Sequence, residues 1–171
     1  MLGLFEQSPQ VYVARDRPAA WGDEEVEFLR RKLVEQKLPR VRICFHRSSD
    51  DPLQEMLILF AGRAYVRPAM HLDREESLLV LEGRGTYFFF DAAGNVVDRI
   101  PLGPLGSGRA CFCRIPQHAY HSLFVESEYM LAEESTTGPY RPEQTVFASW
   151  SPEVGDQAAA ECYLQRLAES C

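Results

Sequence analysis

Two short segments carry histidines, each runs directly into an apolar stretch, and this arrangement limits the folds open to the chain. The first segment contains His71 and Glu76 and leads into the apolar run 77–82. The second segment contains His121 and leads into another apolar run, about one hairpin further on. The two segments can face each other only if the intervening strands fold back antiparallel, as they do in a small β-barrel.

The remaining central sequence also has the pattern of short strands. Val41, Ile43 and Phe45 alternate with more polar residues, which is the period of a strand with two different faces. The glycines of 83–85 predict a hairpin after the first apolar run. Further apolar runs bring the total to about eight to ten short strands, the number and spacing expected of a jelly roll. We therefore predict an all-β, antiparallel β-barrel.

Segments outside the barrel complete the predicted organisation. Residues 10–14 alternate and predict an edge strand, and Asp23 is placed to cap a short helix that Pro39 ends. Residues 156–169 predict a second short amphipathic helix. The resulting division is an N-terminal strand and helix packed on the barrel (1–39), the barrel itself (40–153) and a C-terminal helix (154–171).

Composition excludes several classes of protein. The net charge of −7 and the pI near 5.1 argue against a nucleic-acid surface, which needs clustered lysine and arginine. No apolar run approaches the ~20 residues of a membrane helix, and the first residues lack the basic region of a secretory signal. Five cysteines, an odd number, argue against a disulfide framework. We expect a cytoplasmic protein with no nucleic-acid or membrane partner.

The two histidine segments resemble the two cupin motifs. Glu76 and Gly83 have the spacing that ends the first motif, and Pro116 followed by His121 resembles the second. Within the cupins, the chain is most similar to the WbuC-type cupin-fold metalloproteins, over about residues 40–153. This finer resemblance rests on the combination of Arg40 to His46, Tyr65-Val66-Arg67-Pro68, Gly138-Pro139-Tyr140 and Trp150-Ser151-Pro152. It implies a cupin-type jelly roll.

The chain departs from the WbuC-type pattern at one position. When the sequence is aligned on Pro68 and Glu76, the first histidine of the family's His-x-His pair falls on Ala69, and His71 is the second. A rival register takes His71 as the first histidine and Asp73 as the second, but leaves too few residues before Glu76. We prefer the first register, in which one ligand of the family's four is missing.

The donor types at these positions suit a divalent transition metal. His71 and His121 offer two imidazole nitrogens, and Glu76 offers a carboxylate oxygen, a set that suits zinc, nickel, manganese or iron. Three protein ligands leave coordination positions open, as in a catalytic site. Asp73 is a candidate replacement for the ligand lost at Ala69.

Three further residues are candidates for binding a substrate. Arg42 and His46 alternate with the apolar residues of their strand, and they face either the barrel interior or solvent. Glu55 is the one charge in the apolar run 54–60, a position either at a sheet edge or in a cleft. In the barrel interior, all three side chains would orient a polar ligand by charge and hydrogen bonds.

Two functions follow as hypotheses. The resemblance links the WbuC-type proteins to surface-polysaccharide and nucleotide-sugar metabolism, so the first is a metal-dependent enzyme acting on a sugar derivative or another small polar metabolite. Isomerisation, oxygen-dependent oxidation and lyase chemistry all remain open. The second is a binding protein that has kept the barrel but has no catalytic activity. Ala69 in place of a ligand histidine favours this hypothesis. A homodimer formed through the N-terminal strand is a further prediction.

Overall fold

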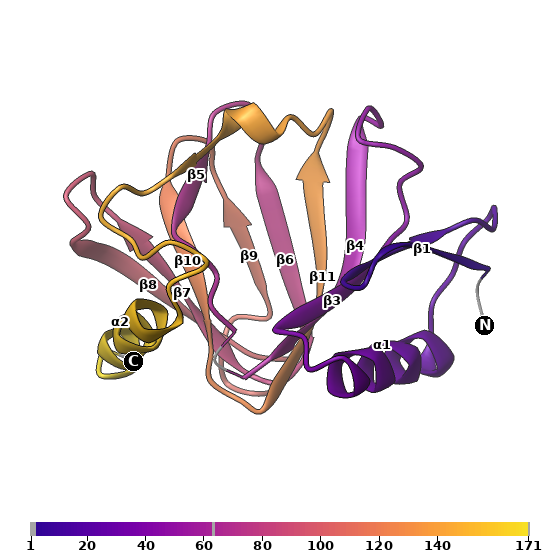
Figure 1. Ribbon diagram of the computed structural model, residues 1–171, viewed down its shortest axis with the longest axis horizontal. Coiled ribbons are helices and arrows are strands. Elements are labelled where there is room, and N and C mark those ends of the chain that lie inside the picture. The colour runs from indigo at the N-terminus through magenta and orange to yellow at the C-terminus, as the bar shows by residue number, and fades with distance from the viewer. Residues whose placement is uncertain (1–2, 63, 171) are drawn as a thin grey trace.

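Two β-sheets face each other and enclose the centre of the protein (Figure 1). The computed structural model describes residues 3–62 and 64–170, so Cys171, the last of the five cysteines, lies outside it. The larger sheet has seven strands, in the order β1 (Leu4–Ser8), β2 (Val11–Ala14), β3 (Arg40–Cys44), β4 (Leu53–Ala61), β11 (Tyr129–Thr137), β6 (Glu76–Glu82) and β9 (Phe112–Ile115).

The smaller sheet has five strands and carries the histidine segments. Its order is β12 (Thr145–Phe147), β5 (Ala69–His71), β10 (Tyr120–Val125), β7 (Gly85–Phe90) and β8 (Val96–Leu102). Neighbouring strands pair antiparallel in both sheets, except that β2 runs parallel to β3. This architecture confirms the prediction of an all-β jelly roll with a short helix near each end of the chain.

Alternation along the strands builds the core between the sheets. On β6, Leu78 and Val80 are buried while Leu79 between them is exposed. These two side chains belong to a cluster that includes Tyr87 and Leu123 from the opposite sheet. Burial of such side chains removes apolar surface from water, the main stabilising contribution to a fold of this kind.

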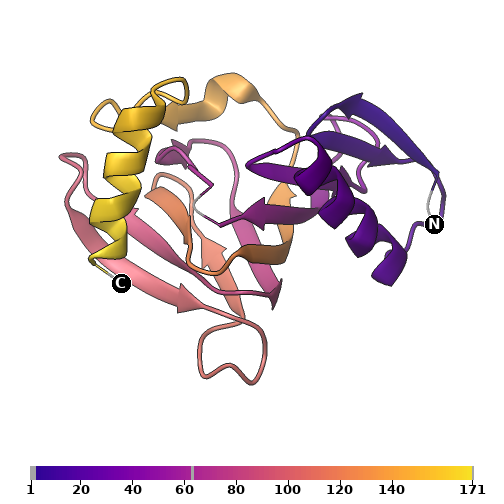
Figure 2. The same ribbon diagram turned by 60° about the horizontal axis from the view of Figure 1, so that its bottom comes forward.

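Each helix covers the outer face of one sheet. Helix α1 (Asp23–Glu35) packs Leu29 and Leu33 on β3 and β4, and helix α2 (Gln157–Ala168) packs Tyr163 and Leu164 on the five-stranded sheet. Figure 2 shows α2 lying across that sheet, far from α1 and the N-terminal strands. The short 3-10 helix η1 (Pro142–Gln144) precedes β12. No helix in the described ranges is long and apolar enough to cross a membrane.

The glycine-containing turn at 83–85 was wrongly predicted to close a hairpin. Strand β6 before it pairs with β11 and β9, whereas β7 after it pairs with β10 and β8, so the turn carries the chain from one sheet to the other. Gly83 has a φ of +79°, which a residue with a side chain adopts only with strain. A glycine-containing turn looks the same in the sequence whether it closes a hairpin or crosses to the other sheet. Which of the two forms depends on strand pairing with residues far away in the chain.

Two predictions near the N-terminus need correction. The strand predicted at 10–14 is not at the sheet edge, because β1 pairs with it on the outer side. Helix α1 is capped by Gly22 rather than by Asp23: the Glu25 carboxylate accepts a hydrogen bond from the Gly22 backbone N–H at 3.0 Å. The described residues form twelve strands rather than eight to ten, since β1, β5 and β12 add short segments with little apolar pattern.

Candidate metal centre

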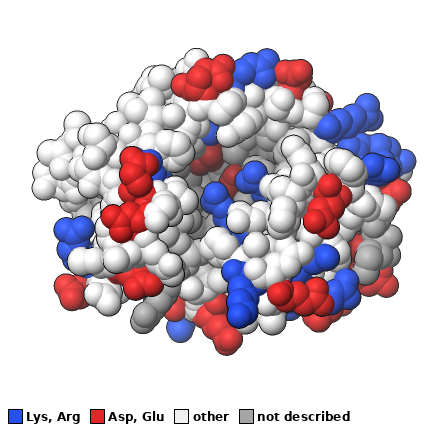
Figure 3. Space-filling model, viewed as in Figure 1, with Lys and Arg blue, Asp and Glu red and all other residues white. Residues whose placement is uncertain are grey.

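A cavity of about 640 Å³, lined by both polar and apolar residues, opens between the two sheets. Figure 3 shows it as a hollow that opens toward the viewer, with both acidic and basic atoms on its wall. Both sheets contribute to the lining, because inward side chains of β3, β4, β6 and β11 face those of β5, β10 and β12. A cavity of this size accommodates a small metabolite.

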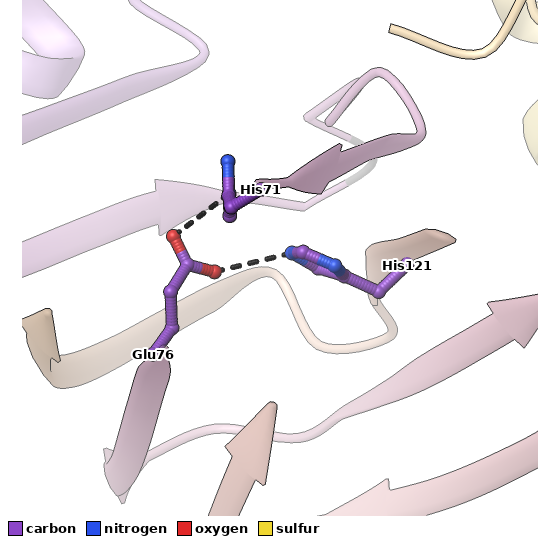
Figure 4. Close-up of side chains that lie close together, drawn as sticks. All are labelled: His71, Glu76 and His121. Carbon is purple, nitrogen blue, oxygen red and sulfur yellow. Dashed lines mark hydrogen bonds and ion pairs between the residues drawn. The ribbon is translucent and has the colours of Figure 1, made fainter. Parts of the chain in front are cut away.

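His71, Glu76 and His121 converge in this cavity. His71 Nε2 lies 3.0 Å from Glu76 Oε1, and His121 Nε2 lies 3.1 Å from Glu76 Oε2, so the carboxylate spans both imidazoles (Figure 4). One donor atom from each residue lies within 4.8 Å of the others. The histidines come from neighbouring strands β5 and β10, while Glu76 begins β6 in the opposite sheet.

Hydrogen bonds orient both imidazoles from behind. His121 Nδ1 lies 2.9 Å from the carbonyl oxygen of Ala119, which can only accept, so Nδ1 carries a proton. His71 Nδ1 lies 3.2 Å from Thr145 Oγ1, on the neighbouring strand β12. Contacts of this kind direct the Nε2 atoms into the cavity, as outer hydrogen bonds do in metal sites.

The cluster alters the ionisation of its members. Burial opposes ionisation of Glu76, but hydrogen bonds from His121 and His71 outweigh it and hold the pKa of the carboxyl well below its usual range. Burial would likewise lower the pKa of His121, yet its hydrogen bond to Glu76 and the charge of that carboxylate raise it. A cation bound at His121 Nε2 would therefore compete with a proton for that nitrogen.

The cluster fits a divalent cation on the chemistry of its donors. The nitrogens of two buried imidazoles and an oxygen of one half-buried carboxylate, all close together, are a recognised set for borderline divalent metals. Fewer than four protein donors leave room for water or a ligand at the same centre.

Asp73 lies apart from this cluster. Its side chain is exposed, and its carboxylate is 3.6 Å from Arg74 Nη1 rather than near the imidazoles. Ala69, by contrast, lines the cavity on the same face of β5 as His71, and its Cα pairs with that of His121. The position that lacks a histidine is thus beside the cluster, and Asp73 does not fill it.

The three residues predicted to bind substrate separate in the structure. Arg42 and His46 both line the cavity, while Val41 and Ile43 pack on α1, so the alternation favours the interior for the polar set. Glu55 is exposed and is not among the cavity residues, because Gln54 and Met56 on either side of it occupy the inward face of β4.

Sequence reasoning missed several residues of the cavity. Arg74 is only 5% exposed, and its Nη2 donates to Thr145 Oγ1 at 2.9 Å. Its guanidinium also lies 5.0 Å from the ring centre of Tyr140. These contacts join positions about 70 residues apart in the chain, which no local pattern reveals.

Glu134 is a second inward carboxylate that the sequence analysis did not identify. Burial, followed by the charge of Glu76, raises the pKa of Glu134 to about 7. The signal was present: Met130, Ala132, Glu134 and Thr136 alternate on β11, and the two apolar members are fully buried. A period-two reading of that run places Glu134 on the inward face.

Two of the sequence segments that carried the resemblance contact each other beside the cavity. Tyr65 Oη donates to the carbonyl oxygen of Pro152 at 2.8 Å, and Arg67 Nε donates to Ser151 Oγ at 3.2 Å. Arg67 also forms a bidentate ion pair with Glu153. These contacts hold the segment leading into β5 against the chain that precedes α2.

The fold and the cluster together define a cupin-type jelly roll with a histidine–glutamate site between its sheets. Residues 29–102, less than half of the chain, match the model of a domain of unknown function, DUF6016. No curated protein matches the chain.

Solved structures show similarity of fold. The protein SO0799 from Shewanella oneidensis is 12% identical, with a TM-score of 0.51 over 61% of this chain and 70% of its own. KdgF from Halomonas sp. is 16% identical, with a TM-score of 0.48 over 75% of this chain and 94% of its own. The capsular polysaccharide assembling protein CapF from Staphylococcus aureus is 16% identical, with a TM-score of 0.49 over 63% of this chain. This chain spans only 31% of the length of CapF.

Proposed function

We propose that this protein binds a divalent transition metal through His71, Glu76 and His121 and acts on a small polar metabolite, such as a sugar or nucleotide-sugar derivative. The observation that carries the proposal is the convergence of three donor atoms within 4.8 Å, two of them on buried histidines, inside a cavity large enough for such a ligand. The substrate class follows the sequence resemblance to WbuC-type cupins.

The chain's own residues prepare the site for chemistry. Thr145 and the Ala119 carbonyl hold the two imidazoles in place, and both histidines are buried, which limits their contact with bulk water. A divalent cation held there would polarise a carbonyl or hydroxyl group of a ligand, or lower the pKa of a bound water molecule. Glu134, with a pKa near neutrality, is able to accept or release a proton inside the same cavity.

Metal analysis of the native, untagged protein tests this proposal. We expect close to one equivalent of metal per chain, and loss of that metal in both His71→Ala and His121→Ala. The variant His118→Ala is the matched control, because His118 is exposed and outside the cluster. A folded native protein without metal, in buffers containing zinc, nickel, manganese or iron in turn, would contradict the proposal.

A non-catalytic binding protein is the second candidate, and Ala69 is the observation that favours it. Alanine occupies the cavity-facing position next to His121, so the site offers one donor fewer than the resemblance implies. A metal-free protein that still binds a sugar-like ligand in the cavity would support this alternative.

A further inference from the structure

We propose that the ligand of this cavity carries an anionic oxygen group, a phosphate or a carboxylate, and that Arg42 and Arg74 bind that group beside the histidine–glutamate cluster. The inference rests on the proposed function for the location of the ligand, and it narrows the substrate class from polar to anionic.

The charge of the cavity wall differs from that of the whole chain. The chain carries a net charge of −7, yet among the described residues of the wall two carboxylates, those of Glu76 and Glu134, stand against five guanidinium groups. The five are Arg40, Arg42, Arg47, Arg67 and Arg74. An excess of positive charge in a concave, partly enclosed surface attracts anions into it.

Protein partners leave most of this charge unbalanced. Arg67 pairs with Glu153, and Arg74 has longer ion pairs with Asp73 and Glu76. Arg40, Arg42 and Arg47 have no ion pair with any residue that the structure describes. Arg40 and Arg42 interact electrostatically with Glu134, a carboxylate on the same wall, but neither forms an ion pair with it. Three of the five arginines therefore line the cavity without an ion pair from the described residues.

Unpaired buried nitrogen atoms point to a missing acceptor. Arg42 Nε and Arg74 Nη1 are both buried and make no hydrogen bond within the described part of the chain, and the same is true of His46 Nδ1. The carboxylate of Asp73 is 3.6 Å from Arg74 Nη1, too far for a hydrogen bond. A buried donor without a partner costs about 1–3 kcal/mol, and more if it is charged, so an acceptor from a ligand would remove that cost.

Guanidinium groups select the chemistry of the ligand. Their planar fork matches the paired oxygens of phosphate and carboxylate groups, which neutral sugars lack. Arg74 Nε is 3.9 Å from Glu76 Oε1, so an anionic group on Arg74 would lie next to the proposed metal position. A ligand that carries an anionic group and a nearby hydroxyl or carbonyl group would contact Arg74 and the proposed metal position at the same time.

Titration with inorganic phosphate and, separately, with malonate tests the proposal. Calorimetry and thermal unfolding are run at constant ionic strength. We expect saturable binding of at least one of the two anions, and a loss of affinity of at least tenfold in Arg42→Gln. Binding of phosphate alone identifies a phosphate group, and binding of malonate alone identifies a carboxylate. Arg30→Gln is the control, because Arg30 pairs with Glu82 away from the cavity.

Further variants separate this proposal from the metal site. Arg42→Lys keeps the positive charge but loses the planar guanidinium group, and we expect a loss of anion affinity smaller than that in Arg42→Gln. This second variant keeps the test valid if Arg42→Gln folds poorly. His71→Ala should lose metal and retain anion binding. Absence of binding of both anions, or equal affinity in Arg42→Gln, Arg42→Lys and the native protein, would overturn the proposal. Anion binding without any metal in the native protein would overturn the metal site alone.

Discussion

Ala69 occupies the position where one more donor side chain would extend the histidine–glutamate cluster. Its side chain faces the cavity, two residues before His71 on the same face of β5, and its Cα pairs with that of His121. In a strand, residues two apart point to the same side, so the geometry already exists and only the donor is missing.

We expect Ala69→His to raise metal affinity by at least about tenfold, or about 1.4 kcal/mol, because it adds an imidazole beside the existing donors. Calorimetric titration with zinc measures the change. Met70→His is the matched control, since Met70 is the next residue along β5 and does not line the cavity. Equal affinities in Ala69→His and the native protein would contradict the orientation of β5 described here.

Glu134 makes the stability of the protein depend on pH. Its carboxyl has a pKa of about 7 in the folded state, against an ordinary value of 4.5. Between these values the folded chain keeps the proton that the unfolded chain releases, so the free energy of unfolding falls as pH rises. The slope is at most about 1.4 kcal/mol per pH unit from this group.

Glu134→Gln should therefore lose less stability between pH 5 and pH 7.5 than the native protein does, by roughly 3 kcal/mol at most. Chemical denaturation at a series of pH values measures the difference. Glu55→Gln, at an exposed position on the neighbouring strand β4, should leave the native pH profile unchanged. Parallel profiles for Glu134→Gln and the native protein would show that Glu134 does not carry this proton.

At the scale of elements, α2 supports the sheet that carries both histidines. Tyr163, Leu164 and Leu167 pack with Phe88 and Phe124 on the outer face of β7 and β10. His121 lies on the opposite face of β10 from Phe124, because it is three residues away in an alternating strand. The helix and the cluster therefore lie on opposite sides of the same strand.

Leu164→Ala should lower the free energy of unfolding by about 2–4 kcal/mol, because it removes buried apolar atoms and leaves a cavity under the helix. Urea denaturation measures the loss. Cys162→Ala, at an exposed position of the same helix, should change stability by less than about 0.5 kcal/mol. Similar effects of the two substitutions would mean that α2 does not pack as described.

At the scale of the whole molecule, the candidate metal centre joins the two sheets. Glu76 belongs to the seven-stranded sheet, and His71 and His121 belong to the five-stranded one. A cation bound by all three would hold the sheets together in the folded state only, and ligands that bind only the folded state stabilise it.

We expect saturating metal to raise the free energy of unfolding by about 2.7 kcal/mol at a concentration of 100 times Kd, and chelation with EDTA to reverse the gain. Thermal unfolding with and without metal measures this change. His121→Ala should show no response to either treatment. A native protein whose Tm is indifferent to every candidate metal would contradict a site that spans the sheets.

The sequence by itself determined the strand pattern and the three metal-capable residues. Strand alternation depends on which side chains are apolar, and the local sequence shows this directly. Val41 and Ile43 are apolar and pack in the core, whereas Arg42 between them is charged. His71, Glu76 and His121 were identifiable because their segments run into apolar strands and because their spacing resembles the two cupin motifs. Local sequence patterns also predicted both helices correctly, except that α1 is capped by Gly22 and not by Asp23.

Only the tertiary structure decided which strands pair and which charges face inward. The turn at Gly83 joins two sheets rather than two paired strands, Arg74 is buried against Thr145, and Glu55 is exposed while Glu134 is not. These outcomes depend on contacts between residues tens of positions apart. A local pattern specifies that a side chain alternates, but the partner strand specifies which face becomes the cavity and which meets solvent.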